Sequence, residues 1–286
     1  MVAAATERIR VGSGGVMLPN HAPLVVAEQF ALLEAAHAGR IDLGIGRAPG
    51  TDPVTSYALR HGAGGVSDDA VELFSSYVDD ILTMMSPGGA GLQVNGRMHP
   101  LNATPRATSR AMVWLLGSSD YSAGLAAEKG LPYVFAHHFS GRGTAEALDL
   151  YRSSYRPSQE HPEPRTFLTV NAAVAPTREE ANRLVLPNLL SMIALRTGGP
   201  LAPQLLVEEA EERGVPDQHR PLADQMLERW IVGAPDEAAE QVSKLSATYD
   251  VDEVMLHPVA GAVARTPADT APAREATLRL LSDALA

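Results

Sequence analysis

The sequence contains no cysteine among its 286 residues, and its charge is unevenly divided. Without cysteine the chain forms no disulfide, thiolate metal site or iron–sulfur cluster and has no thiol nucleophile, which fits a reducing compartment such as the cytoplasm. Lysine and arginine together number 23, against 34 aspartate and glutamate residues, so the formal net charge is −11. A nucleic-acid-binding surface needs clustered basic residues, so a nucleic-acid partner is not expected.

Long apolar stretches are also missing. No run approaches the ~20 apolar residues that a membrane-spanning helix requires. The first residues mix acid and base before any apolar stretch, unlike a secretory signal. We therefore expect a cytoplasmic protein that is not bound to a membrane. Hydrophobic residues make up 45% of the chain, which is ordinary for a globular protein with a buried core.

What is present is a regular alternation of apolar runs and amphipathic segments. Strands that alternate with helices imply βαβ units and a parallel sheet, so we predict an α/β fold. No Pro-, Ser- or charge-rich linker divides the chain, so residues 1–286 are predicted to form a single domain. The predicted strands are 9–18, 41–46, 113–117, 133–137, 167–175 and 253–257. The predicted helices are 24–38, 67–85, 121–129, 144–155, 177–190, 234–247 and 271–285.

The strand over 9–18 and the residue that follows the next strand are both candidates for ligand contact. Gly14 and Gly15 lack side chains, so a large group could approach the backbone there. The same glycines would also fit a bulge or a close helix contact. Arg47 follows the strand 41–46, where an arginine suits a phosphate or lies on the surface in water. Asp42, within that strand, is expected to be a structural polar group.

A third candidate is the turn that ends the strand 113–117. It reads Leu116-Gly117-Ser118-Ser119, and a helix begins within three residues. The first N–H groups of a helix lack intrahelical partners and favour an anion, so this turn suits a phosphate. Ser119 and Ser122 lie one helical turn apart and could both donate to it. Plain capping of the helix by Ser119 or Asp120 explains the same residues, and the sequence leaves both interpretations open.

Two adjacent histidines, His137 and His138, end the strand 133–137. Neighbouring residues on a strand face opposite sides, so only one of the two points into a barrel. That histidine could bind substrate or move a proton near neutral pH, or it could be structural. His21 and His257 follow other strands in the same way. No carboxylate or third histidine stands at metal-ligand spacing, so no metal is expected.

Four stretches together resemble the luciferase-like flavin monooxygenases, the bacterial luciferase family. They are IRVGSGGVMLPNHAPLVVAEQF, GRIDLGIGRAPGTDP, WLLGSSDYSAGLAAEKGLPYVFAHHF, and IVGAPDEAAEQV followed by DEVMLHP. The resemblance implies a TIM-type (β/α)8 barrel, reduced FMN, O2, a small organic substrate and a homodimer. It also places the flavin ring at Gly14–Gly15 with a cis peptide bond between them. The flavin phosphate then falls at Arg47, at residues 116–119 and at Ser122.

The sequence departs from that family at its start. Family members carry roughly sixty to seventy more residues, or about two βα units, ahead of the matching part. We therefore expect an N-terminally incomplete barrel in which catalysis is poor or absent. A flavin reductase is an expected partner, because no G-x-G-x-x-G nicotinamide fingerprint follows a strand. The alternatives are a non-catalytic flavin-binding or truncated structural relative and a relative that uses a deazaflavin. Loops 48–66 and 86–110 would set the substrate, which the sequence does not identify.

Overall fold

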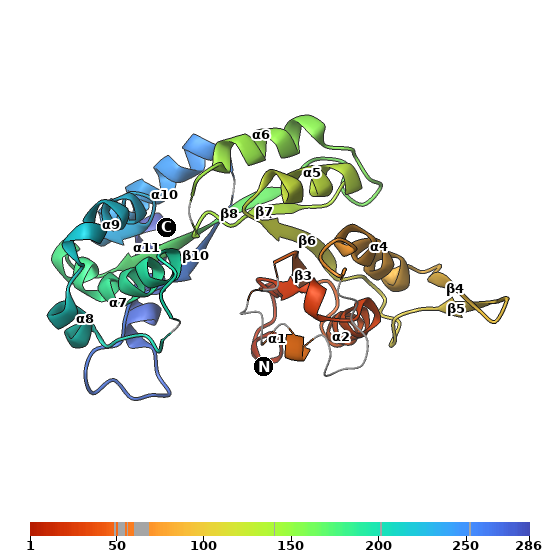
Figure 1. Cartoon of the computed structure of the whole chain (residues 1–286), viewed down its shortest axis with the longest axis horizontal. Helices are drawn as coiled ribbons and strands as arrows, with labels where there is room; N and C mark the ends of the chain where they lie inside the picture. Colours follow the sequence, from red (N-terminus) through yellow and green to blue (C-terminus); the bar gives the residue numbers. More distant parts are fainter. Residues whose placement is uncertain are drawn as a thin grey trace. The chain divides into compact units, whose positions relative to one another are not determined.

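The computed structural model describes residues 1–48, 50, 55, 57–59, 69–139, 141–200, 202–251 and 253–286 (Figure 1). They form two compact units. The first comprises Met1–Val134 with Glu146–Arg165, and the second comprises Phe135–Ala145 with Thr166–Ala286. A single barrel domain over 1–286 stays a prediction. Within the described residues, no helix has both the length and the apolar character needed to cross a membrane.

The first unit is built on parallel strands. Strand β3 pairs in parallel with β1, β2 and β6, and its residues Ile41, Leu43 and Ile45 are buried. Helices α2 and α4 pack against each other beside this sheet. The strands are β1 Val11–Gly12, β2 Val16–Met17, β3 Ile41–Gly46, β6 Met112–Gly117 and β7 Tyr133–Phe135, which carries the chain into the second unit. The helices are α1 Val2–Ala5, η1 Leu18–Asn20, α2 Pro23–Ala36, α4 Phe74–Met85 and α5 Asp120–Lys129.

The second unit is built around the long strand β8, Thr166–Val174. One stretch of β8 pairs in parallel with β10, Val254–Pro258, and its last residues pair with β9, Ile231–Gly233. Buried Ala, Val, Leu and Ile side chains of β8, β9 and the surrounding helices form its core. The helices are α7 Arg178–Arg196, α8 Val207–Arg213, η2 Asp217–His219, α9 Arg220–Leu227, α10 Pro235–Tyr249 and α11 Pro272–Leu285, and α6 Thr144–Ser154 begins here and continues in the first unit.

The α/β alternation is confirmed, with parallel pairing in the main sheet of each unit. The strands that were not predicted are β9 and the two strands of an antiparallel hairpin, β4, Ala90–Val94, and β5, Arg97–Leu101. The predicted strand 133–137 is shorter, because it ends at Phe135. The helix predicted over 67–85 starts at Phe74 in the structure, and residues 67–68 lie outside the described residues.

The prediction of one continuous strand over 9–18 is wrong, because a bulge interrupts it. Val11 and Gly12 pair with Ile41 and Asp42, but Val16 pairs with Ile45, so three residues oppose two. The extra length is held by Ser13, whose Oγ accepts from the Gly44 N–H at 3.0 Å and donates to the Gly44 carbonyl at 2.9 Å. A side chain thus replaces ladder bonds at the bulge.

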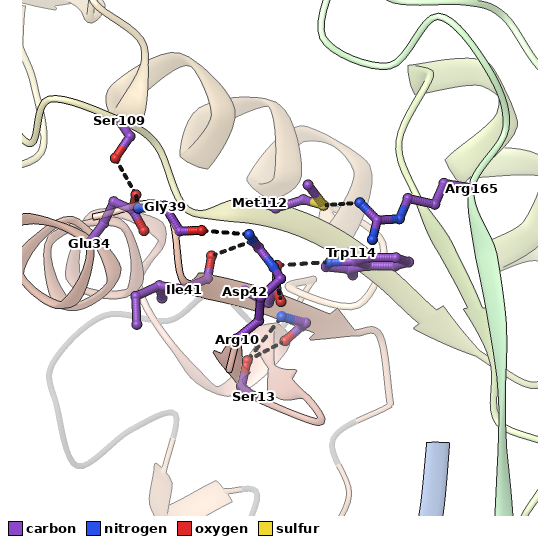
Figure 2. Close-up of polar contacts among 11 residues, drawn as sticks. Arg10, Ser13, Glu34, Gly39, Ile41, Asp42, Ser109, Met112, Trp114 and Arg165 are labelled. Carbon is purple, nitrogen blue, oxygen red and sulfur yellow. Dashed lines mark hydrogen bonds and ion pairs between the residues drawn. The ribbon is translucent and has the colours of Figure 1, made fainter. Parts of the chain in front are cut away.

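Asp42, expected to be a structural polar group, anchors a network at the start of β3 (Figure 2). Arg10 donates to both of its carboxylate oxygens, at 3.0 and 2.7 Å, and the Trp114 indole N–H donates at 3.2 Å. The Arg165 guanidinium lies 5.2 Å from the centre of the Trp114 ring. The contacts join β3, β6 and the segment before β1, which is a structural role.

The Tyr151 hydroxyl forms buried hydrogen bonds in the core of the first unit. The side chain is fully buried, and the hydroxyl lies 2.9 Å from the Leu131 carbonyl and 3.1 Å from both the carbonyl and the N–H of Arg165. It therefore links the ends of two loops through one buried oxygen. Burial raises the pKa of Tyr151, so the hydroxyl keeps its proton at neutral pH.

We expect Tyr151→Phe to lower the free energy of unfolding by about 1–3 kcal/mol, because it leaves buried backbone groups without their partner. Urea unfolding at pH 7 measures the loss. Tyr155→Phe is the matched control, since its hydroxyl also bonds two carbonyls, of Gly130 and His161, but is only partly buried. A Tyr151→Phe loss no larger than that of the control would contradict the assignment.

Candidate functional site

The turn between β6 and α5 presents two exposed serines at a helix start. Ser119 is the N-cap residue of α5, yet its side chain makes no capping hydrogen bond. Thr177 occupies the same position in α7, and its Oγ1 accepts from the Glu180 N–H at 3.2 Å. The hydroxyl of Ser119 is therefore not used to cap its own helix. Of the two interpretations left open by the sequence, capping by the Ser119 side chain is not observed, and a phosphate contact stays a prediction.

Arg47 reaches the same turn from the end of β3. Its guanidinium carbon lies 4.1 Å from the centre of the Tyr121 ring, in the first turn of α5. Stacking on an aromatic face holds the planar guanidinium in place and leaves its edge N–H groups available to an anion. Because Gly46 and Leu116 are register partners, β3 and β6 end side by side. Arg47 and Ser119 therefore follow adjacent strand ends.

Ser122 and Gly117 are in contact, but Ser122 is not open to solvent. A Cβ at Gly117 would overlap the Ser122 hydroxyl oxygen, so this position has no room for a side chain while Ser122 holds its present rotamer. Ser122 is 5% exposed, whereas Ser118 and Ser119 are exposed. Among the predicted phosphate residues, Ser118 and Ser119 are thus the accessible hydroxyls of this turn, and Ser122 is buried.

The glycines of the bulge leave the strand edge uncovered. A Cβ at Gly14 would meet nothing within 4 Å, whereas one at Gly15 would lie 2.8 Å from the Gly44 carbonyl oxygen. Gly14 therefore borders open space, and Gly15 permits close backbone approach. The expected cis peptide between them is wrong, because the cis bond found among the described residues is Thr104–Pro105. The Ser13 contacts already accommodate the extra residue without it.

The predicted catalytic histidines lie in the second unit and face different partners. His137 is 3% exposed, and its Nδ1 lies 2.9 Å from the Thr144 hydroxyl. Thr144 donates its proton to the Gly141 carbonyl at 3.1 Å, so it accepts from His137 Nδ1–H. The buried Nε2 has no hydrogen bond of standard geometry. His137 is therefore the inward, structural member of the pair.

His138 is the more accessible histidine. Its Nδ1 lies 2.5 Å from the hydroxyl of Thr169 on β8, and its ring centre lies 6.0 Å from that of His257 on β10. His257 Nδ1 in turn contacts Asn171 Oδ1 at 2.9 Å. The structure thus brings together His138 and His257. Asn171 joins them and was missed by sequence reasoning, since it stands inside an apolar strand. His21 is exposed at the end of η1, in the first unit.

Both predicted histidines are neutral at pH 7. Burial, assisted by the positive charge of Arg229, lowers the pKa of His137 to about 4, and the Arg229 backbone carbonyl acts weakly in the opposite direction. Burial also lowers the pKa of His138 to about 4, with His257 and His137 as further causes. A neutral imidazole keeps one lone pair, so His138 can accept a hydrogen bond or a proton from a bound molecule.

No group of three or more histidine, aspartate or glutamate side chains suited to a metal ion occurs within the part of the chain that the structure describes. The geometry instead offers two functional clusters. In the first unit, Arg47, Ser119 and the α5 start suit a phosphate. In the second unit, His138 and His257 suit a neutral polar group. Loop 48–66 lies mostly outside the described residues, and loop 86–110 holds the β4–β5 hairpin.

Comparison with known proteins gives one family. The family model described as "Luciferase-like monooxygenase" matches residues 1–250. The protein YvbT of Bacillus subtilis (strain 168) is 39% identical over 256 residues, which cover 90% of this chain and 73% of YvbT. The luciferase-like monooxygenase of Escherichia coli (strain K12) is 36% identical over 258 residues, which cover 90% of this chain and 73% of that protein.

Solved structures share the fold. The crystal structure of apo-MsnO8 matches with a TM-score of 0.81 and 32% identity, over 99% of this chain and 79% of that one. The oxygenating constituent of 3,6-diketocamphane monooxygenase from Pseudomonas putida, in complex with FMN, matches with a TM-score of 0.66 and 19% identity. The match covers 99% of this chain and 80% of that one. These similarities establish the predicted TIM-type α/β architecture.

Proposed function

We propose that this chain, which belongs to the luciferase-like monooxygenase family, is a monooxygenase that uses reduced FMN and O2 to oxygenate a small organic substrate. The observation that carries the proposal is the exposed Ser119 hydroxyl, which leaves its own helix uncapped beside the stacked Arg47. A helix start, a free hydroxyl and an arginine together form a phosphate-binding arrangement. FMN has one phosphate, which this arrangement would bind.

The residues present fit FMN. Arg47, Ser118 and Ser119 would hold the phosphate, with residues 116–117 and Ser122 shaping the turn beneath it. Gly14 and Gly15 would leave the strand edge open to a flat ring, because a Cβ at Gly14 meets nothing within 4 Å. When bound, reduced FMN supplies the electrons with which O2 is activated. The protein's own part is to bind the cofactor, orient the substrate and exclude water.

His138 would orient the substrate. Its neutral ring is fixed by Thr169 and is partly accessible, so it accepts a hydrogen bond without bringing a charge into the site. His137 would instead support this segment from the buried side, through Thr144. We further propose that a separate flavin reductase supplies the reduced cofactor, and that the enzyme acts as a homodimer in the cytoplasm.

Removing the Ser119 hydroxyl should weaken FMN binding selectively. We expect Ser119→Ala to raise the Kd for FMN about tenfold, since a hydrogen bond to a charged group contributes about 1.5–3 kcal/mol. Riboflavin lacks the phosphate, so its Kd should change less than about twofold. Titration of each flavin with the protein, followed by flavin fluorescence, measures both constants.

Thr177→Ala is the matched control, because Thr177 occupies the same N-cap position but bonds its own helix. This variant should lower the free energy of unfolding by about 1 kcal/mol and leave the Kd for FMN unchanged. Equal effects of Ser119→Ala on FMN and riboflavin would contradict a phosphate contact. Binding of a deazaflavin with Kd well below that for FMN would contradict the choice of cofactor.

Turnover is tested by isotope incorporation. The chain is supplied with FMN, a flavin reductase, a nicotinamide reductant and ¹⁸O2, together with a panel of an aldehyde, a ketone and a thioether. A monooxygenase places one ¹⁸O atom in the product, which mass spectrometry detects. Flavin oxidation that yields only hydrogen peroxide with every substrate, in protein shown to bind FMN, would favour the non-catalytic flavin-binding alternative.

A further inference from the structure

Two side chains of the second unit, together with one backbone carbonyl, form a hydrogen-bonded chain from a strand interior to an exposed face. Asn171 on β8 is 2% exposed, and its Nδ2 donates to the His138 carbonyl at 3.1 Å. Its Oδ1 lies 2.9 Å from Nδ1 of His257, which stands on the exposed face of β10. His257 and Asn171 are register partners in the parallel β8–β10 pair, so the two side chains are neighbours on the sheet.

The orientation of the amide follows from what each partner can do. The His138 carbonyl only accepts, so the amide must turn its NH2 group toward it. The amide oxygen then faces His257 and accepts from it, which requires a proton on Nδ1. In a neutral ring the other nitrogen, Nε2, then has no proton. Reversing the amide would place two oxygens against each other at the His138 end.

The groups around His257 keep its ring neutral. The His138 ring meets it edge-on from the β7 side, and Arg274 reaches it from α11. Desolvation, with the Arg274 charge as the second cause, lowers the pKa of His257 below its ordinary value. At pH 7 the ring therefore has one proton, and Asn171 decides which nitrogen holds it.

We propose that Asn171 is a positioning residue that holds His257 with its proton on Nδ1 and so presents the bare Nε2 as an acceptor for a hydroxyl or N–H group of the substrate. The contact with substrate rests on the proposed function, whereas the tautomer does not. The arrangement parallels metal and catalytic sites in which a second residue fixes which imidazole nitrogen is free. It selects substrates that offer a hydrogen-bond donor.

The tautomer is measured directly in chain labelled with ¹⁵N-histidine, by long-range ¹H–¹⁵N correlation spectra at pH 7. His257→Gln identifies the signals of His257. We expect a protonated Nδ1 and an unprotonated Nε2 in the unaltered chain. In Asn171→Leu the tautomer should shift toward a protonated Nε2. In Asn171→Asp one carboxylate oxygen still accepts from Nδ1–H, so the tautomer should persist, and the added negative charge should raise the pKa of His257. The other oxygen faces the His138 carbonyl and replaces a hydrogen bond with a repulsion, so this variant should also be less stable than the unaltered chain.

Asn188→Leu, the same replacement in α7, is the matched control and should leave the His257 signals unchanged. A protonated Nε2 in the unaltered chain overturns the proposal, as does an Asn171→Leu spectrum in which the tautomer is unchanged. If Asn171→Leu fails to fold, the His257 tautomers in the unaltered chain and in Asn171→Asp still test the proposal, because both keep an acceptor at position 171. None of these readouts needs flavin, O2 or substrate.

The substrate contact is tested on whichever compound gains ¹⁸O in the turnover assay. His257→Gln keeps an acceptor oxygen near the position of Nε2, whereas His257→Leu does not. We expect His257→Leu to raise KM about tenfold and His257→Gln to raise it less than about threefold, as for loss and retention of one hydrogen bond. Equal KM values for the two variants overturn the contact. Absence of product from the unaltered chain overturns the proposed function and this contact, but not the tautomer.

Discussion

Lowering the pH from 7 to 5 should destabilise the second unit by about 3 kcal/mol, through His137 and His138. Burial lowers the pKa of each to about 4 in the folded chain, against 6.5 for an ordinary histidine. The unfolded chain therefore takes up protons first. The stability due to these rings is complete above pH 6.5 and is lost as the pH falls toward 4, at up to 1.36 kcal/mol per pH unit for each ring.

The two tryptophans allow this loss to be assigned. Trp230 is buried in the second unit, with both histidines, and Trp114 is buried in the first. Urea unfolding followed by fluorescence in Trp114→Phe should show a midpoint that falls steeply between pH 7 and pH 5. The same experiment in Trp230→Phe reports the first unit and should show a smaller fall. Most carboxylates titrate below this window, so they contribute little to the difference.

His137→Gln provides the internal control, since an amide can contact Thr144 without titrating. This variant should be less stable at pH 7 but should lose clearly less on acidification than the unaltered chain, because His138 still titrates, together with His257, whose pKa is also lowered. If the urea midpoints reported by Trp230 fluorescence are equal at pH 7 and pH 5, that result would contradict the burial of neutral histidines.

The strand–helix order was readable from the sequence, because buried parallel strands are continuous apolar runs. The glycines at 14 and 15 allowed a bulge, but the sequence did not show that one is present. Its extra residue shows only against Ile45 and Gly44 of the neighbouring strand, which lie some thirty positions away. The hairpin did leave a local signal. Asn95 and Gly96 both have positive φ, at 50° and 77°, and an Asn-Gly pair is the usual sequence of such a two-residue turn.

The candidate site, like the fold, could be predicted from the sequence only in part. The residue types at the β6–α5 turn predicted a phosphate or a cap, and the structure adds that the Ser119 side chain does not cap α5. Arg47 was predicted from its place after a strand, but its Tyr121 partner lies in a different βα unit. The role of Asn171 could not be predicted from the sequence. A single polar residue in a buried strand points to a function only once His257, 86 positions later, is known to lie beside it.

The second large effect concerns Gly44, in the middle of β3. A Cβ there would overlap the Ser13 carbonyl oxygen and lie 2.9 Å from Leu116 Cδ1. The Ser13 carbonyl does not move freely, because it is backbone and the Ser13 hydroxyl bonds both backbone groups of Gly44. We expect Gly44→Ala to cost about 3 kcal/mol of unfolding free energy, the upper part of the range for overpacked cores.

Gly46→Ala tests the cause, because it makes the same chemical change two residues along the same strand. A Cβ at Gly46 meets nothing within 4 Å, so this variant should change the free energy of unfolding by less than about 0.5 kcal/mol. Urea unfolding of both variants, followed by Trp114 fluorescence, gives the comparison. If alanine were unfavourable throughout this strand, the urea midpoints of both variants would fall alike, and that result would contradict a steric role for the bulge. A loss confined to Gly44→Ala would mean that the first unit folds only if the Ser13–Gly15 backbone can lie directly against β3. The open edge at Gly14 beside the Arg47–Ser119 cluster would then depend on this contact.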